Sequence, residues 1–209
     1  MYEVSGRFPD MTWDDYRKRE LKAGRAEPQM VGNVNLDELT TDSGMSSGRT
    51  KTPGGRWQRL RWMELFSRLG QAPDHQEIPP CWRWFPYKSW PLRISPPHVG
   101  SLDRHQYERL VGKLEAVTAS DDAMCLCYYS ALSCGSESPE GLVVKVAMGD
   151  LRDLYDFDRV SGSPSNIWPE DRSWLVWTDS DLNSTCVRGP WTLVAEVEAD
   201  PEFETIRWP

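Results

Sequence analysis

Hydrophobic and polar positions recur along the chain with two different periods, and the change from one to the other outlines the secondary structure. Apolar residues return every three to four positions over residues 57–69 and 101–117, which predicts two docked helices. Ser101 is expected to cap the second helix, and Gly70 to end the first. Shorter apolar runs bounded by turn-forming residues predict strands. These runs occupy residues 124–129, 142–147, 173–178, 184–188 and 203–208.

Two further helices are expected between the predicted strands. One is short and covers residues 150–155, and the other starts at Pro190, a residue that suits the first turn of a helix. The strands on either side of the polar stretch 179–183 are predicted to form a hairpin. Hairpins with interspersed helices favour an α+β fold, with a mostly antiparallel sheet and helices packed on one face.

The N-terminal part of the chain lacks this periodicity. Thr12 can cap a short, mostly charged helix over residues 13–21, and residues 25–55 read as a polar linker rich in glycine and proline. We therefore predict a flexible N-terminal extension over residues 1–55, followed by a single α+β domain over residues 56–209. Within that domain, residues 78–97 carry too many prolines for a central strand or helix, and we expect an ordered loop there.

Composition limits the class of protein. With 209 residues, 39% hydrophobic residues and eleven tryptophans, the chain can bury one compact core without disulfide or metal staples. The five cysteines form an odd set without regular spacing, which favours reduced thiols and a cytoplasmic location. No stretch approaches the roughly 18 consecutive apolar residues of a membrane span, so we expect no membrane insertion.

Charge is distributed unevenly along the chain. Residues 1–56 carry nine cationic and nine anionic side chains, residues 57–118 carry nine and six, and residues 119–209 carry six and seventeen. A strongly negative segment repels phosphate backbones and attracts basic surfaces. Arginines do alternate with tryptophans over residues 57–62 and 82–84, as in single-stranded nucleic-acid platforms, but a docked helix and a covering loop explain the same residues. We therefore expect a basic protein partner, and we consider nucleic acid unsuited.

The densest group of potentially specific residues lies in residues 163–174. It combines Trp168 and Trp174 with Glu170, Asp171 and Arg172. This Trp-Pro-Glu-Asp-Arg-Ser-Trp block, followed by Thr-Asp-x-Asp, resembles the C-terminal block of a group of small bacterial proteins. The resemblance covers roughly residues 56–209 and implies no activity. We interpret both tryptophans as core residues, and Asp171 and Arg172 as turn residues.

Two other patterns raise the question of a metal site. Asp179 and Asp181 are spaced so that both could bind a hard cation, although a hairpin turn accounts for them as well. Cys125 and Cys127 fall on one face of a predicted strand, but the three histidines supply too few further ligands for structural zinc. We therefore predict buried thiols, no resident metal and no cofactor.

These observations lead to a non-catalytic protein-binding module, one form of which is an immunity-type protein that neutralises a basic bacterial toxin. The sequence contains no Gly-rich phosphate loop, no Gly-x-Ser-x-Gly elbow and no His-Glu-x-x-His helix. One alternative is a metal-dependent enzyme built on Asp179 and Asp181 with Glu170 or Asp171, and another is a structural or regulatory domain. The candidate binding residues are Glu170, Asp171, Arg172, Asp179 and Asp181.

Overall fold

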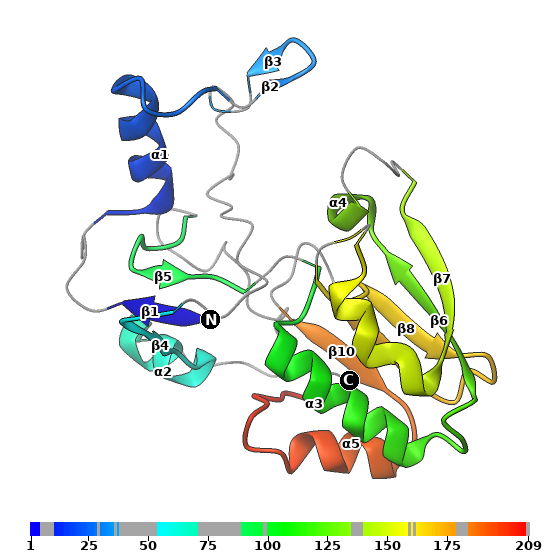
Figure 1. Ribbon diagram of the computed structural model, residues 1–209. Helices are drawn as coiled ribbons and strands as arrows, with labels where there is room; N and C mark the ends of the chain where they lie inside the picture. Colours follow the sequence, from blue (N-terminus) through cyan, green and yellow to red (C-terminus); the bar gives the residue numbers. More distant parts are fainter. Residues whose placement is uncertain are drawn as a thin grey trace. The chain divides into compact units, whose positions relative to one another are not determined.

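The chain forms two compact units, each described here by itself. The first comprises Met1–Gly48, Pro53–Leu60 and Cys81–Pro96, and the second comprises Arg49–Thr52, Arg61–Pro80 and Pro97–Pro209. The structure is a computed structural model (Figure 1), and it describes residues 1–4, 11–28, 30–35, 37, 54–70, 89–97, 100–134, 140–158, 160, 162–178 and 184–207.

A five-stranded antiparallel sheet is the centre of the second unit. Its strand order is β10-β9-β8-β6-β7. The α+β class and the antiparallel sheet are therefore confirmed, as is the predicted β9–β10 hairpin, in which Leu175 lies opposite Arg188. The strands are β6 (Met124–Tyr129), β7 (Leu142–Ala147), β8 (Asn166–Pro169), β9 (Leu175–Thr178) and β10 (Thr185–Arg188).

One face of this sheet is covered by helices. Helices α3 (Arg104–Val117) and α5 (Trp191–Glu198) and the 3₁₀ helix η4 (Met148–Asp156) lie on the same side of the sheet (Figure 1). This confirms the predicted packing of helices on one face. The shared core joins side chains from the helices and from the covered face, among them Tyr107, Leu110, Val111, Leu114, Cys125, Cys127, Met148, Leu151, Ile167, Trp174, Val176 and Leu193.

Helix η4 is a regular 3₁₀ helix of 9 residues, although 3₁₀ runs longer than about four residues are uncommon. Because a 3₁₀ helix has three residues per turn, side chains three apart lie above one another. The edge towards the core carries buried apolar side chains, at Met148, Leu151 and Leu154. The edge towards water carries exposed carboxylates, at Asp150, Asp153 and Asp156. The sequence pattern correctly predicted a short helix here.

The helix predicted to be capped by Ser101 begins later. Asp103 is the N-cap of α3, and its carboxylate accepts a hydrogen bond of 2.9 Å from the amide of Gln106. Ser101 is buried instead, and its hydroxyl accepts a hydrogen bond of 2.7 Å from the amide of Ser163. Both residues are suitable caps, so local chemistry could not separate them, and a contact 62 residues away decides between them.

Two other predicted elements also need correction. The helix predicted from residue 57 starts only at α2 (Trp62–Leu69), because Trp57–Arg59 forms strand β4. The strand predicted over residues 203–208 is absent from the described residues 203–207. In that segment, the Glu204 carboxylate accepts hydrogen bonds of 2.7 and 3.0 Å from the amides of Trp62 and Met63, so it caps α2. Helix α2 ends, as predicted, at Gly70, whose φ is 65°.

The first unit contains a three-stranded sheet of order β4-β1-β5, with β1 (Tyr2–Val4) between β4 and β5 (Ile94–Ser95). Its helix α1 (Trp13–Lys22) has the predicted cap at Thr12. The indole of Trp13 donates a hydrogen bond of 2.9 Å to the carbonyl of Ile94, so α1 is anchored on the segment that forms β5. Strands β2 (Met30–Val31) and β3 (Val34–Asn35) pair as a hairpin.

Several predictions fall partly outside the described residues. Residues 38–53 of the predicted linker and residues 78–88 of the predicted proline-rich loop are among them. The flexibility of residues 1–55 and the domain boundary at residue 56 stay predictions. None of the described helices combines the length and the hydrophobicity that crossing a membrane requires.

Candidate functional site on the outer sheet face

The five-stranded sheet has a second face, turned away from α3, α5 and η4. Residues opposite each other in an antiparallel pair share a face, and the register pairs Leu126 with Trp168, Tyr128 with Asn166, and Asn166 with Trp177. Extending this register defines the outer face. Its side chains are Met124, Leu126, Tyr128, Val143, Lys145, Ala147, Asn166, Trp168, Leu175, Trp177, Cys186 and Arg188.

The outer face is mostly apolar and is not covered by any described helix of the second unit. Val143 is 57% exposed and Trp177 is 40% exposed, whereas Leu126, Tyr128 and Trp168 are half-buried. Trp168 was predicted to be a core residue, and this is a correction, because its strand position directs it to the outer face. A contiguous apolar surface of this kind is typical of an interaction site.

Trp174 does lie in the core, as predicted. Its side chain is buried, with a relative exposure of 2%, and its indole nitrogen donates a hydrogen bond of 3.1 Å to the Thr118 hydroxyl. The residue after β10, Gly189, is packed against it. A Cβ atom added at Gly189 would lie 2.8 Å from the Trp174 Cβ, which is too close for any side chain. Trp174 is therefore held from two sides.

The β8–β9 turn contains three of the predicted site residues. The amide of Arg172 donates a hydrogen bond of 2.9 Å to the Pro169 carbonyl, and the amide of Ser173 donates one of 2.9 Å to the Asp171 carboxylate. The bond from Ser173 lowers the pKa of Asp171, which therefore stays ionised at neutral pH. Arg172 has a φ of 55°, in the left-handed region that favours glycine. The interpretation of Asp171 and Arg172 as turn residues is confirmed.

Glu170, the first residue of this turn, is engaged with a neighbouring strand. Its carboxylate forms an ion pair with the ammonium group of Lys145, on the outer face of β7. Both side chains are about half exposed, so the pair contributes on the order of 0–1 kcal/mol to stability. Its main effect is to fix the position of the turn against the sheet.

A small pocket opens where the turn meets the end of the β9–β10 hairpin. It has a volume of about 220 Å³. Arg172 reaches it from the turn, and Arg188 reaches it from the edge strand β10, opposite Leu175. The full lining is Arg172, Ser173, Trp174, Leu175, Arg188 and Gly189. Two arginines therefore contribute to the lining of one pocket.

The predicted site residues are only partly brought together. Glu170, Asp171 and Arg172 share one turn, whereas Asp179 and Asp181 lie outside the described residues. The flanking described residues, Thr178 and Thr185, pair at the other end of β9, with their hydroxyls 3.0 Å apart. Arg188 was not predicted as a site residue. The register of the predicted hairpin could have indicated it, because that register places residue 188 beside the start of the preceding strand.

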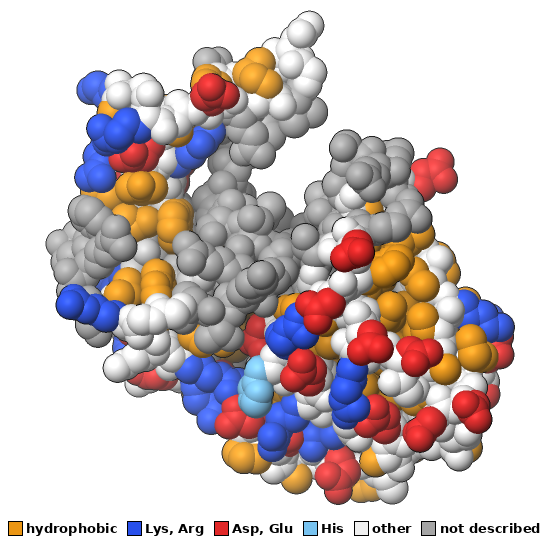
Figure 2. Space-filling model, viewed as in Figure 1, with side chains coloured by type: hydrophobic (Ala, Val, Ile, Leu, Met, Phe, Trp, Pro, Cys, Tyr) orange, Lys and Arg blue, Asp and Glu red, His pale blue; other side chains and the backbone are white. Residues whose placement is uncertain are grey.

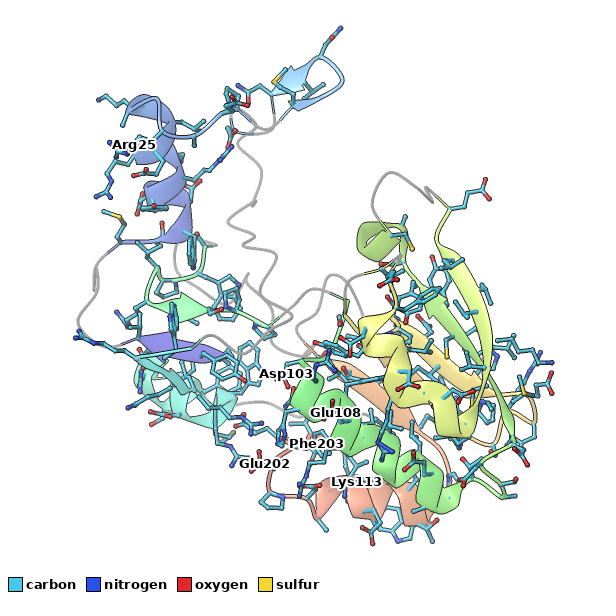
Figure 3. All side chains as sticks on the ribbon, viewed as in Figure 1. Arg25, Asp103, Glu108, Lys113, Glu202 and Phe203 are labelled. Atoms are coloured by element: carbon cyan, nitrogen blue, oxygen red, sulfur yellow. The ribbon has the colours of Figure 1, made fainter. Side chains whose placement is uncertain are left out.

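The helix-covered side of the second unit is charged rather than apolar. Figure 2 shows acidic and basic side chains interspersed over α3, η4 and α5. Lys113, labelled on α3 in Figure 3, forms an ion pair of 3.0 Å with the buried carboxylate of Asp200, which also accepts a bond of 2.6 Å from Arg109. Within the described part of the unit, seven exposed carboxylates have no ion-pair partner: Asp121, Asp122, Glu140, Asp150, Asp153, Asp158 and Asp171.

Nucleophilic and metal chemistry find little support in the described residues. The predicted burial of Cys125 and Cys127 is confirmed, and burial raises the pKa of the Cys125 thiol to about 11 and that of Cys127 further. A thiol of such pKa is a poor nucleophile at neutral pH. No group of three or more histidine, cysteine, aspartate or glutamate side chains that could hold a metal ion occurs among the described residues.

No protein-family model, no curated protein and no solved structure matches this chain. The resemblance carried by residues 168–174 therefore brings no activity to the chain. Function has to be inferred from the geometry of the outer face, the turn and the pocket.

Proposed function

We propose that the chain is a non-catalytic protein-binding module that docks its partner on the outer face of the five-stranded sheet. The observation that carries this proposal is the apolar character of that face. A strand with apolar residues on both faces is typical of a sheet that is covered on both sides. β6 has this pattern, with Cys125 and Cys127 on one face and Leu126 and Tyr128 on the other, yet the described helices α3, α5 and η4 cover only the first.

The residue types on the outer face support docking by a protein. Aromatic side chains are enriched in the centres of protein interfaces, and Tyr128, Trp168 and Trp177 lie on three neighbouring strands. Burying one large apolar side chain contributes roughly 1.5–3 kcal/mol relative to leaving it in water. A partner that covers this face would gain that energy without reordering the sheet.

The charge of the second unit favours a basic partner. Among its described residues, seven exposed carboxylates lack an ion-pair partner, whereas Arg172 and Arg188 are the only lysines or arginines that lack one. A field of this sign accelerates encounter with a positive surface. An immunity-type protein that neutralises a basic toxin is one concrete form of the proposal, and the cysteine pattern favours the cytoplasm as its location.

The test compares two matched surface variants of the full chain. The double variant Val143→Ser/Trp177→Ser removes two exposed apolar side chains from the outer face, whereas Trp191→Ser removes a ring that is 63% exposed on α5, in the helix layer. Proteins captured by the wild type are identified, purified and titrated against all three chains. We expect the double variant to bind at least about 30-fold more weakly, the loss typical of one interface hot spot of about 2 kcal/mol. The Trp191→Ser control should bind like the wild type.

Two outcomes would contradict the proposal. One is a partner that binds the double variant as tightly as the wild type, which would place the interface elsewhere. The other is self-association of the wild type in sedimentation velocity that the double variant abolishes, which would make the outer face a contact between copies of this chain. The charge argument is tested separately, because the association rate should fall as salt screens the field beyond about 8 Å at 0.15 M. A rate indifferent to salt would rule out steering by the carboxylates.

A further inference from the structure

Arg172 and Arg188 stand apart from the other cationic side chains of the second unit. Within its described part, every other lysine and arginine lies next to a carboxylate. Arg172 and Arg188 have no carboxylate partner among the described residues, and both line the same pocket. In a segment where acidic residues far outnumber basic ones, two unpaired arginines at one place point to an anion that comes from outside the chain.

Arg172 occupies a position that usually belongs to glycine. A residue other than glycine in the left-handed region costs roughly 1–2 kcal/mol, and such residues cluster at ligand clamps. Arg172 is the only described residue other than glycine with a positive φ. The Pro169–Arg172 and Asp171–Ser173 hydrogen bonds hold this conformation, in which Arg172 is one of the residues that line the pocket.

The opposite side of the pocket is equally fixed. Arg188 ends strand β10, which is paired with β9 over its full length. Behind it, Gly189 lies against the buried Trp174 with no room for a Cβ atom, and the Trp174 indole is hydrogen-bonded to Thr118. The backbone and the Trp174 ring on this side of the pocket are therefore held in place before any ligand binds.

We propose that this pocket binds a doubly charged oxyanion, the phosphate group of a phosphate monoester. The planar guanidinium fork matches phosphate oxygens in a bidentate manner, and two such forks match a dianion better than a single carboxylate. At about 220 Å³ the pocket is smaller than the roughly 300–1,000 Å³ of sites for drug-sized molecules, so it accommodates a group and not a whole large ligand. The ionised Asp171 carboxylate lies in the same turn but does not line the pocket.

This site is independent of the proposed protein interface. Arg188 belongs to the outer face, but anion binding is measured on the chain alone, without a partner, so the two proposals fail separately. The direct test is a titration of the full chain with inorganic phosphate, followed by amide resonances in NMR. Parallel titrations use sulfate, which is a dianion at all relevant pH values, and acetate, which carries one charge. We expect phosphate and sulfate to shift the resonances of residues 172–175 and 188–189, and acetate to bind at least about tenfold more weakly.

Three variants make the test specific. Arg188→Gln and Arg172→Asn should each weaken phosphate binding at least about tenfold, the effect of losing one hydrogen bond to a charged group. Asparagine tolerates the left-handed region, so Arg172→Asn should keep the melting temperature of the wild type. The control Arg207→Gln removes an exposed arginine that pairs with Glu198, and it should leave the affinity within about twofold.

The possible results separate clearly. Acetate that binds as tightly as phosphate would overturn the assignment of a dianion. Arginine variants that bind phosphate like the wild type would place the site elsewhere. An equal loss in the Arg207→Gln control would show that phosphate responds to general charge and not to this pocket. Loss confined to Arg172→Asn and Arg188→Gln, with the fold retained, supports the proposal.

Discussion

The two faces of the five-stranded sheet differ less in composition than in what covers them. On the inner face, Cys127 and Val176 are almost completely excluded from water beneath α3, α5 and η4. On the outer face, Leu126 and Trp177 are comparably apolar, yet Trp177 is 40% exposed. Apolar content alone therefore does not tell which face belongs to the core of the chain. The difference lies in coverage, because the described helices α3, α5 and η4 of the second unit lie on the inner face.

The largest expected effect comes from two tryptophans three positions apart. Trp174→Ala on the buried side should lower the free energy of unfolding by roughly 3–5 kcal/mol, because it leaves a large cavity and removes the bond to Thr118. Trp177→Ala on the outer face should cost less than about 1 kcal/mol, because its ring is already partly in water. Urea denaturation of both variants measures the difference. Equal losses would mean that the outer face is covered within the chain.

The next comparison, with a smaller expected effect, concerns the rates at which cysteines on the two faces react with an alkylating reagent. Cys125 faces the core with a pKa raised to about 11, so at pH 8 only about one thiol in a thousand is ionised, whereas Cys186 is exposed on the outer face. Alkylation of the folded chain, mapped by peptide mass spectrometry, should therefore label Cys186 at least about 100-fold faster than Cys125. Cys186→Ser should remove only the fast site. Comparable rates at the two cysteines would show that the inner face opens readily to solvent.

The smallest expected effect on stability concerns the ion pairs of Asp200 with Arg109 and Lys113, which connect the end of α5 to α3. The Arg109 hydrogen bond, together with bonds from the Glu202 amide and Lys113, holds the pKa of Asp200 well below its usual range. Because the pKa is lower in the folded chain, this carboxylate contributes stability above the unfolded pKa of about 4 and loses it progressively at lower pH. Asp200→Asn should cost roughly 1–3 kcal/mol at pH 7, since Arg109 is partly exposed.

Measuring the same variant at lower pH checks the sign of this effect. The difference between wild type and Asp200→Asn in urea denaturation should shrink steadily as the pH falls below about 4. A difference that stayed constant down to pH 2.5 would mean that Asp200 acts through packing and not through its charge. The helix layer would then depend on shape alone.

The sequence predicted those parts of the fold that depend on neighbouring residues. The periodicity of residues 124–129 and 142–147 and the polar turn after residue 178 were enough to predict β6, β7 and the β9–β10 hairpin. Strand β8 was not predicted, because its pairing partner β6 lies some 40 residues earlier and local patterns do not contain that contact. The same reason explains β4, which pairs with the first residues of the chain.

In the candidate site, too, the sequence predicted what depends on neighbouring residues and not what depends on distant contacts. Glu170, Asp171 and Arg172 could be singled out because unusual residues are concentrated in one short stretch. For Arg188 the hairpin register could indicate only its place beside Leu175, whereas its place with Arg172 in one pocket lining and its lack of a carboxylate partner among the described residues exist only after folding. The outer face was equally hidden, since a sequence records that a side chain is apolar but not whether a helix covers it.

In helix η4, the side of the helix that a residue occupies depends on a period of three positions. Met148, Leu151 and Leu154 are buried, whereas Asp150, Asp153 and Asp156 face water. Within each set the residues are three positions apart, which is one turn of a 3₁₀ helix. Inserting one residue before Leu151 would rotate every later side chain by a third of a turn. A carboxylate would then occupy a core position, which a conservative substitution never causes. Inserting three residues would restore the rotation but would shift the later side chains by roughly 6 Å along the helix axis.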